Sequence, residues 1–200
     1  MLNLFKDIRL MFKMESSRLI DRKKIKYTFT DVMIDIETCS TDNNAQILSI
    51  GIVKFNLFSE ENNTETYTIY IDQSSCKDYH IDENTMKWWE KQPKSVYDDA
   101  FTQGPRVSMK EACEKLNEYC RFSTRYWCQG MNFDCVILTN AFKKEEVTPV
   151  WKYWQWRDSR TVQNMCKQNK VKNNHTALSD AINQVETVKF VFKTYNIQSA

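Results

Sequence analysis

Apolar and polar residues alternate in the first part of the chain in the way that short β-strands require. The pattern predicts three strands, over residues 31–38, 45–56 and 64–72. The connections between these strands are short and polar, which favours an antiparallel meander. In the first strand, "DVMIDIET", the alternation places Val32, Ile34 and Ile36 on one face. Asp35 and Glu37 then stand side by side on the other face.

Beyond residue 80 the apolar spacing becomes helical. Pro93 interrupts the first helical pattern, and Ser108 with Glu111 has the form of a capping box. The spacing predicts helices over 82–92, 95–101, 108–122, 132–144, 158–169 and 176–195, and two further strands over 125–129 and 150–156. These elements predict an α/β fold with a mixed five-stranded sheet flanked by helices.

Composition excludes several classes of protein. The mean hydropathy is -0.62, and no apolar run approaches the roughly 20 residues that span a bilayer, so we expect no membrane association. With 3 glycines, the chain holds neither G-x-x-x-x-G-K nor G-x-G-x-x-G. The 7 cysteines, an odd number without a C-x-x-C pair, suit a reducing, cytoplasmic setting.

The N-terminal segment differs in charge from the rest of the chain. Residues 1–28 hold eight Lys or Arg and three acids. Two interpretations stay open: an arm that contacts phosphate backbones, or a solvated and partly disordered leader. We expect the folded domain to occupy residues 29–200. Plentiful Lys and Asn are compatible with an AT-rich genome, such as a viral one.

The acid pair on the first strand needs an explanation. Two like charges about 4 Å apart repel by about 4 kcal/mol at an effective dielectric constant near 20. Such a cost implies a nearby cation, from the protein or a metal, if both side chains point into a cleft. The alternative is an ordinary solvated strand face.

Further polar residues stand where a metal site would use them. Asp134 and Asp180 fall near predicted helix starts, and His175 precedes Asp180 by five residues. The helix dipole alone favours acids at such positions, so each is weak evidence singly. Together with Asp35 and Glu37 they indicate a metal-binding site of hard oxygen ligands.

Three segments resemble the three motifs of the DEDDh 3′-to-5′ exonucleases, which have the ribonuclease-H-like fold: "MIDIETCSTDNNAQILSIGIVKF", "WCQGMNFDCVIL" and "HTALSDA". Asp35 and Glu37 match the first motif, Asp134 the second, and His175 with Asp180 the third. "DENTMKWWEKQP" and "WRDSRT" also resemble stretches in a subgroup of phage DexA-type, exodeoxyribonuclease-VIII-like and small bacterial exoribonuclease enzymes. Relatives often have glycine where this chain has Cys128.

The resemblance implies a metal-dependent exonuclease that releases 5′-mononucleotides from nucleic-acid 3′ ends. Asp35, Glu37, Asp134 and Asp180 would hold two Mg²⁺ or Mn²⁺ ions, and His175 would act as general base. The substrate would be single-stranded or otherwise 3′-ended DNA or RNA, in the cytoplasm, or the host cytoplasm for a viral protein. DNA and RNA both stay open.

Four other residues are candidates for substrate contact. Trp88 and Trp89 have side chains that stack on bases, although adjacent helix positions do not share a face. Phe133 lies beside the second motif, and Arg157 has a charge suited to phosphate. Core packing or a local ion pair is the alternative for each.

Two other descriptions of the chain stay open. One is a catalytically silent nucleic-acid-binding module on the same fold, and the other is a structural protein with an acidic patch. Relatives are often dimers, so the resemblance also raises a homodimer.

Overall fold

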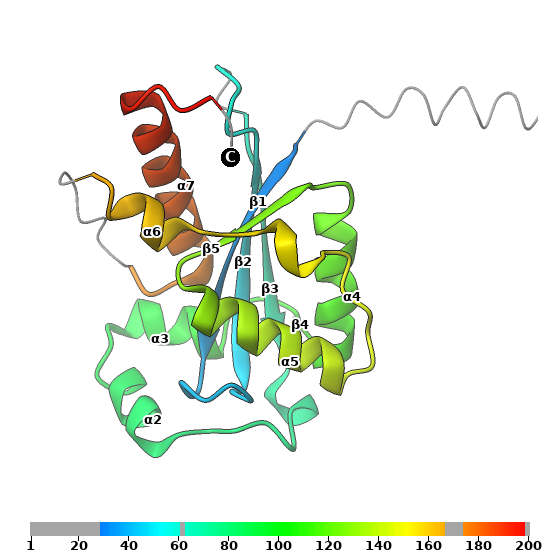
Figure 1. Ribbon diagram of the computed structural model, residues 1–200. Coiled ribbons are helices and arrows are strands. Elements are labelled where there is room, and N and C mark those ends of the chain that lie inside the picture. The colour runs from blue at the N-terminus through cyan, green and yellow to red at the C-terminus, as the bar shows by residue number, and fades with distance from the viewer. Residues whose placement is uncertain (1–28, 61–62, 167–173, 199–200) are drawn as a thin grey trace, which may run out of the picture.

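The sheet is built around the strand that carries the acid pair (Figure 1). The computed structural model describes residues 29–60, 63–166 and 174–198. The strands are β1 (Asp31–Thr38), β2 (Ile47–Phe55), β3 (Glu65–Ile71), β4 (Arg106–Val107), β5 (Arg125–Cys128) and β6 (Trp156–Asp158). Their order is β4-β3-β2-β1-β5-β6, so β1 lies inside the sheet.

The strand directions confirm the antiparallel meander and the mixed sheet. β1 pairs with β2, and β2 with β3, in antiparallel fashion, whereas β4, β5 and β6 add in parallel. The predicted number of five strands is wrong, because the two-residue β4 also pairs with the end of β3. Two residues are too short a run to show a period of two in the sequence.

The helices follow the predicted order, with some different bounds. They are α2 (Glu83–Trp89), α3 (Lys94–Phe101), α4 (Met109–Cys120), α5 (Val136–Lys144), α6 (Ser159–Gln163) and α7 (Ala177–Thr194). Ser108 caps α4 as predicted, since its Oγ accepts a hydrogen bond of 3.2 Å from the Glu111 N–H. The predicted strand over 150–156 is mostly wrong, because the segment contains a 3₁₀ turn, Tyr153–Gln155, and pairing begins only at Trp156.

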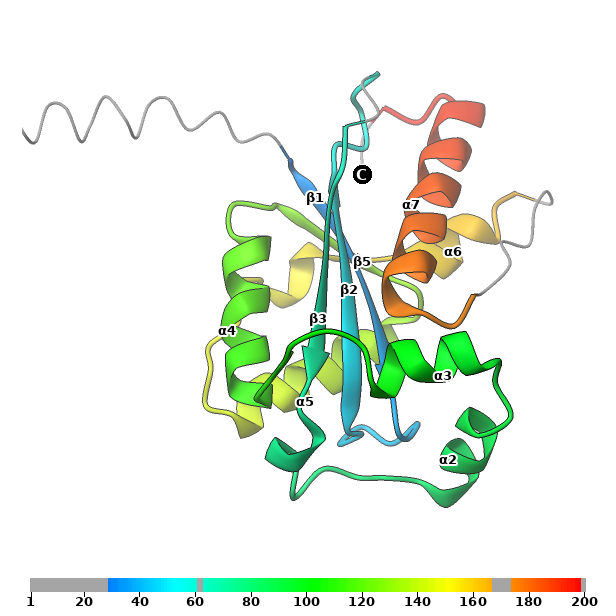
Figure 2. The ribbon, with the colours of Figure 1, turned by 180° about the vertical axis from the view of Figure 1, so that it is seen from behind.

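Two helical layers cover the two faces of the sheet (Figures 1 and 2). On one face, Val32, Ile34 and Ile36 pack against residues of α4 and α5. On the other, Met33 and Val53 pack against α7. Odd-numbered residues of β1 therefore face α7, and this face includes Asp35 and Glu37.

Two further points concern membrane association and the segments outside the described residues. No helix within the described ranges is long and apolar enough to cross a membrane. The basic segment 1–28 lies outside the described residues, and so does the end of the helix predicted over 158–169.

Candidate active site

Strand β1 presents two carboxylates toward the start of α7. Asp35 and Glu37 are both half-buried. Across the antiparallel pairing, Asp35 lies opposite Gly51 and Glu37 lies opposite Ser49. Neither neighbour carries a charge, so β2 supplies no cation to offset the repulsion between the two acids.

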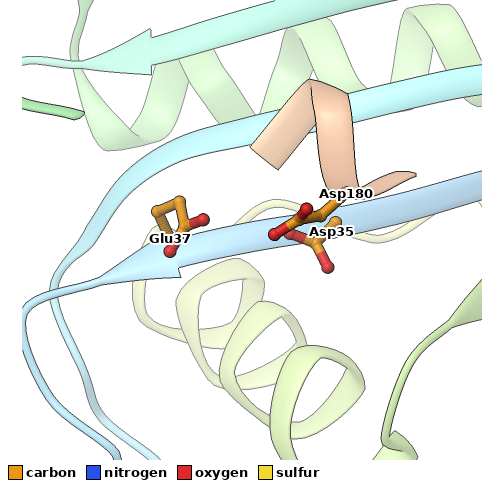
Figure 3. Close-up of side chains that lie close together, drawn as sticks. All are labelled: Asp35, Glu37 and Asp180. Carbon is orange, nitrogen blue, oxygen red and sulfur yellow. The ribbon is translucent and has the colours of Figure 1, made fainter. Parts of the chain in front are cut away.

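The first turn of α7 adds a third carboxylate. Asp180 is 6% exposed, and its two oxygens accept hydrogen bonds from the backbone N–H groups of Asn174 (2.8 Å) and His175 (3.1 Å). One carboxylate oxygen from each of Asp35, Glu37 and Asp180 lies within 4.8 Å of the others. Figure 3 shows Asp180 reaching from its helix toward the two side chains of β1. The structure thus brings together residues about 145 positions apart.

A glycine permits this close approach of helix and sheet. A Cβ atom on Gly51 would lie 2.2 Å from the carbonyl carbon of Ala177 and 2.4 Å from the backbone nitrogen of Leu178. Those distances are well inside van der Waals contact, and the clashing atoms are backbone. The start of α7 therefore rests on the bare backbone of β2, in register with Asp35.

Asp134 lies at the edge of β1 beyond the point where β5 stops pairing. The parallel β1–β5 register ends at Met33 and Trp127. Further along, Asp134 Oδ1 accepts a 3.2 Å hydrogen bond from the Ile36 N–H, and the residue is 3% exposed. A π-helical segment, Met131–Cys135, places Asp134 there. Asp134 is not a member of the three-carboxylate group, but it adjoins the same strand.

Burial and mutual repulsion make these carboxyl groups hard to ionise. Burial raises the pKa of Asp35 well above its usual value, and the charges of Asp134 and Glu37 raise it further. The pKa of Glu37 rises to about 8, from burial and then from Asp180 and Asp134. Burial raises the pKa of Asp134 to about 7 and also raises that of Asp180. A bound cation would reverse this preference, because it stabilises the ionised forms.

His175 lies directly beside Asp180. Its backbone has a φ of 55°, in the left-handed region, and its N–H donates one of the two hydrogen bonds that Asp180 accepts. The imidazole is edge-on to the Trp88 ring, with centroids 5.0 Å apart and planes at 85°.

A pocket of about 360 Å³ adjoins Glu37 on the side of α2. Trp88 is 39% exposed at this pocket, and Phe133 is partly buried beside it. Trp89 also borders the pocket but is 1% exposed, and its Nε1 donates to the Thr38 carbonyl (2.9 Å). Trp89 therefore anchors α2 to the end of β1, whereas Trp88 offers a ring face. The remaining lining residues are Ile36, Thr38, Thr41, Asn84 and Thr85.

Arg157 does not join the acidic group. It lies on the edge strand β6, and its Nη1 donates to the carbonyls of Trp154 (2.9 Å) and Trp156 (3.0 Å). None of its hydrogen bonds within the described residues reaches the carboxylates of β1.

Sequence reasoning missed one member of the site, Gln184. Its Nε2 donates to Asp35 Oδ1 at 2.6 Å, and its buried Oε1 has no hydrogen-bond partner among the described residues. Gln184 follows Asp180 by four positions on α7, and residues at that spacing share a helix face. That spacing was the available signal.

Comparisons with known proteins agree with this geometry. The nuclease domain of 3′hExo, a DEDDh family member solved with rAMP, has a TM-score of 0.57 and 11% identity, covering 88% of this chain and 96% of that one. Pop2p of S. pombe, in a form with Mg²⁺ and Mn²⁺ bound, has a TM-score of 0.54 and 11% identity, covering 98% and 92%. The RNase domain of yeast Pop2 has a TM-score of 0.55 and 9% identity, covering 90% and 82%.

At such low identity these likenesses establish the fold alone. Comparison with the sequences of curated proteins gives no significant match. The sequence does match the family described as the 3′-5′ exoribonuclease Rv2179c-like domain, over residues 30–192. That range contains all three acidic motifs. The chain belongs to this family of 3′-5′ exoribonuclease Rv2179c-like domains, and it shares its fold with the nuclease domain of the DEDDh family member 3′hExo.

Proposed function

We propose that this protein removes nucleotides one at a time from the 3′ end of an unpaired RNA strand and releases 5′-mononucleotides. The observation that carries the proposal is the group formed by Asp35, Glu37 and Asp180, with oxygens within 4.8 Å of one another, and Asp134 on the same strand. The choice of RNA is supported by the description of the family as exoribonucleases.

The four carboxylates fit two Mg²⁺ or Mn²⁺ ions. Carboxylate oxygens suit hard cations, and the group found among the described residues consists of carboxylates alone. Within the described residues no ion pair involves any of the four acids, so no protein cation directly contacts them. Such ions, when bound, would polarise the phosphate and stabilise the departing 3′-oxygen.

The protein's own residues supply the remaining steps. A water molecule attacks the terminal phosphorus, the bond from phosphorus to the 3′-oxygen breaks, and that oxygen takes a proton. We assign the proton acceptor for the attacking water to His175, because imidazole is the side chain that most often serves as a general base. Gln184 holds Asp35 in place, and the N–H groups of Asn174 and His175 hold Asp180.

The pocket beside Glu37 is proposed to hold the departing nucleoside. Its volume of about 360 Å³ lies in the range of small-ligand sites, which begins at about 300 Å³. Trp88 and Phe133 border it with aromatic rings that can stack on a base without selecting its sequence. We infer an unpaired end, since a base that stacks between these rings leaves its partner strand.

A nuclease assay on 5′-labelled single-stranded RNA and DNA tests this function. Wild-type protein with Mg²⁺ or Mn²⁺ is expected to shorten RNA from its 3′ end, and EDTA to stop it. His175→Asn is expected to slow release by about 10²- to 10⁴-fold, the usual contribution of a general base. Glu118→Gln, an exposed acid on α4, serves as control and should match wild type.

Three outcomes would change the proposal. Release by wild type no greater than by Asp35→Ala would exclude an active nuclease. If RNA were bound but left intact, the chain would be a silent binding module. Faster release from DNA than from RNA would correct the substrate alone.

The setting of the protein is proposed on separate grounds. All seven cysteines are free thiols, in agreement with a reducing cytoplasm. A homodimer is also proposed, because α7 exposes Ile182 (36%) and Phe190 (44%) beside a groove of about 480 Å³. Analytical ultracentrifugation of wild type and Phe190→Glu would test it, with a monomer for both as the contrary result.

A further inference from the structure

The side chain of Arg160 lies against residues 129 and 130, where the loop that leads to Asp134 begins. Its Nη2 donates to the Gln129 carbonyl at 3.1 Å. A Cβ on Gly130 would lie 3.6 Å from Cζ and from both terminal nitrogens of Arg160. Three equal distances mean that the guanidinium lies flat over this glycine. With a φ of 119°, Gly130 also makes the turn into the segment that carries Asp134.

The loop and the arginine are fixed to one another. Asp158 Oδ1 accepts hydrogen bonds from the Gly130 N–H and the Arg160 N–H, both at 3.1 Å. Asp158 Oδ2 accepts from Thr161 Oγ1 at 2.8 Å. Asp158 therefore ties the backbone of Arg160 to this loop, and the guanidinium is held to the same loop through the Gln129 carbonyl.

Most of the hydrogen-bonding capacity of this guanidinium is unused. A guanidinium has five N–H donors. In the described part of the chain, the guanidinium of Arg160 donates one hydrogen bond, to the backbone carbonyl of Gln129. Within the same residues Arg160 forms no ion pair, and its side chain is exposed. A fixed, exposed fork of donors suits an anion with several oxygens, such as phosphate.

The charge of Arg160 also reaches the acidic site. It lowers the pKa of Asp134, against the larger effect of burial. Gln129, Gly130 and Arg160 do not line the pocket beside Glu37. Arg160 therefore lies outside the pocket proposed for the departing nucleoside, and a phosphate that it binds would belong to another part of the strand.

We propose that Arg160, lying over Gly130, binds a backbone phosphate of the retained strand, on the 5′ side of the bond that is cleaved. It would act as a substrate-positioning residue and make the enzyme prefer strands with more than one phosphate. This inference rests on the proposed function.

Replacement of single phosphates tests the assignment. Oligonucleotides with one neutral methylphosphonate, placed in turn at the first three linkages 5′ of the terminal bond, would be compared in wild type and Arg160→Ala. At one position wild type should show KM raised about 10-fold or more, with a smaller change in kcat. Arg160→Ala should show that higher KM on the unmodified strand and should not respond to the replacement at that position.

Two further variants separate binding from folding. Arg160→Lys keeps the charge but not the fork, and should recover part of the lost affinity. Arg121→Ala removes an exposed arginine at the end of α4 and should leave KM unchanged. Equal melting temperatures would show that Arg160→Ala is folded. If Arg160→Ala responded to every replacement as wild type does, the proposal would be overturned.

A binding measurement separates this proposal from the proposed function. Fluorescence anisotropy of a labelled strand, with Ca²⁺ in place of Mg²⁺, should show affinity about 10-fold weaker for Arg160→Ala. Release of nothing from any strand by wild type would end the proposed function, and anisotropy would still decide the role of Arg160. Unchanged affinity would refute that role even in an active nuclease.

Discussion

Both ends of strand β1 carry acidic side chains on the same face, but the surroundings of these acids differ. At the start, Asp31 is fully buried and accepts five hydrogen bonds. They come from Arg125 Nε (2.6 Å) and Nη2 (2.7 Å), Trp127 Nε1 (2.9 Å), Thr30 Oγ1 (2.8 Å) and the Leu57 N–H (3.2 Å). At the other end, Asp35 accepts one hydrogen bond, from Gln184, and Glu37 accepts none from the described residues.

The difference separates a structural acid from acids that await a ligand. Asp31 has its counter-charge and its donors within the fold, so its burial serves the sheet. Asp35 and Glu37 have raised pKa values from burial and from other carboxylates, with no protein cation to offset them. A domain that saturates one buried carboxylate so fully would be expected to do the same for the others, unless they bind something else.

Removal of charge at the site end should have the largest effect on activity. Asp35→Asn should lower the rate of nucleotide release by about 10³-fold or more, since metal-assisted stabilisation is worth several kcal/mol and each 1.36 kcal/mol is tenfold. Without metal, the Asp35→Asn variant should be at least as stable as wild type, because the substitution removes a repulsive charge. Release rates and thermal melts check both, and a stability loss equal to that of Asp31 variants would erase the contrast.

Removal of the carboxylate at the other end of β1, at Asp31, should lower the stability of the fold more than it lowers activity. Asp31→Ala leaves Arg125, whose side chain is 19% exposed, without its partner. Loss of one partner of a buried pair costs about 3–5 kcal/mol. Urea unfolding should show a decrease of that size, with a smaller one for Asp31→Asn. The remaining folded protein should keep wild-type kcat, and a stable but inactive Asp31→Ala would contradict this role.

The contact between α7 and β2 offers an intermediate effect. Gly51→Ala would push the start of α7 away from the sheet, since the new Cβ meets the backbone of Ala177 and Leu178. Overpacking of this kind costs about 1–3 kcal/mol. The folded variant should also be less active than wild type, because Asp180 moves with α7 away from Asp35 and Glu37. Chemical unfolding and Mn²⁺ affinity measure the two effects, and wild-type Mn²⁺ affinity would show that the spacing is not critical.

The stability of the metal-free protein should depend on pH in a direction set by the site. The raised pKa values of Glu37, about 8, and Asp134, about 7, mean that the folded form keeps protons which the unfolded form loses near pH 4. This contribution is present below about pH 4 and is lost as pH rises to 8. The melting temperature should therefore fall between pH 5 and pH 8, and fall less in Glu37→Gln. Saturating Mn²⁺ should remove the decline, and a rising melting temperature in metal-free buffer would oppose the account.

The five motif residues were predicted from the resemblance to the three exonuclease motifs, and local periodicity predicted only that Asp35 and Glu37 share one face of their strand. The π-helical turn that brings Asp134 to the Ile36 N–H has no such signal, since it depends on where β5 stops pairing. Gly51 appeared as an ordinary strand residue, and its role arises only when α7 packs on it. The adjacent tryptophans show the same limit: Trp89 is buried and Trp88 half-exposed, and tertiary packing decides which is which.

Calorimetric titration of the metal-free protein with Mn²⁺ tests the central claim most directly. The account predicts two ions per chain in wild type, weaker or incomplete binding in Asp35→Asn, and wild-type binding in Glu118→Gln. Tighter binding at pH 8 than at pH 6 should accompany it, because protons compete for the same carboxylates. No binding in wild type, or the same binding in Asp35→Asn, would show that the acids of β1 are not a metal site.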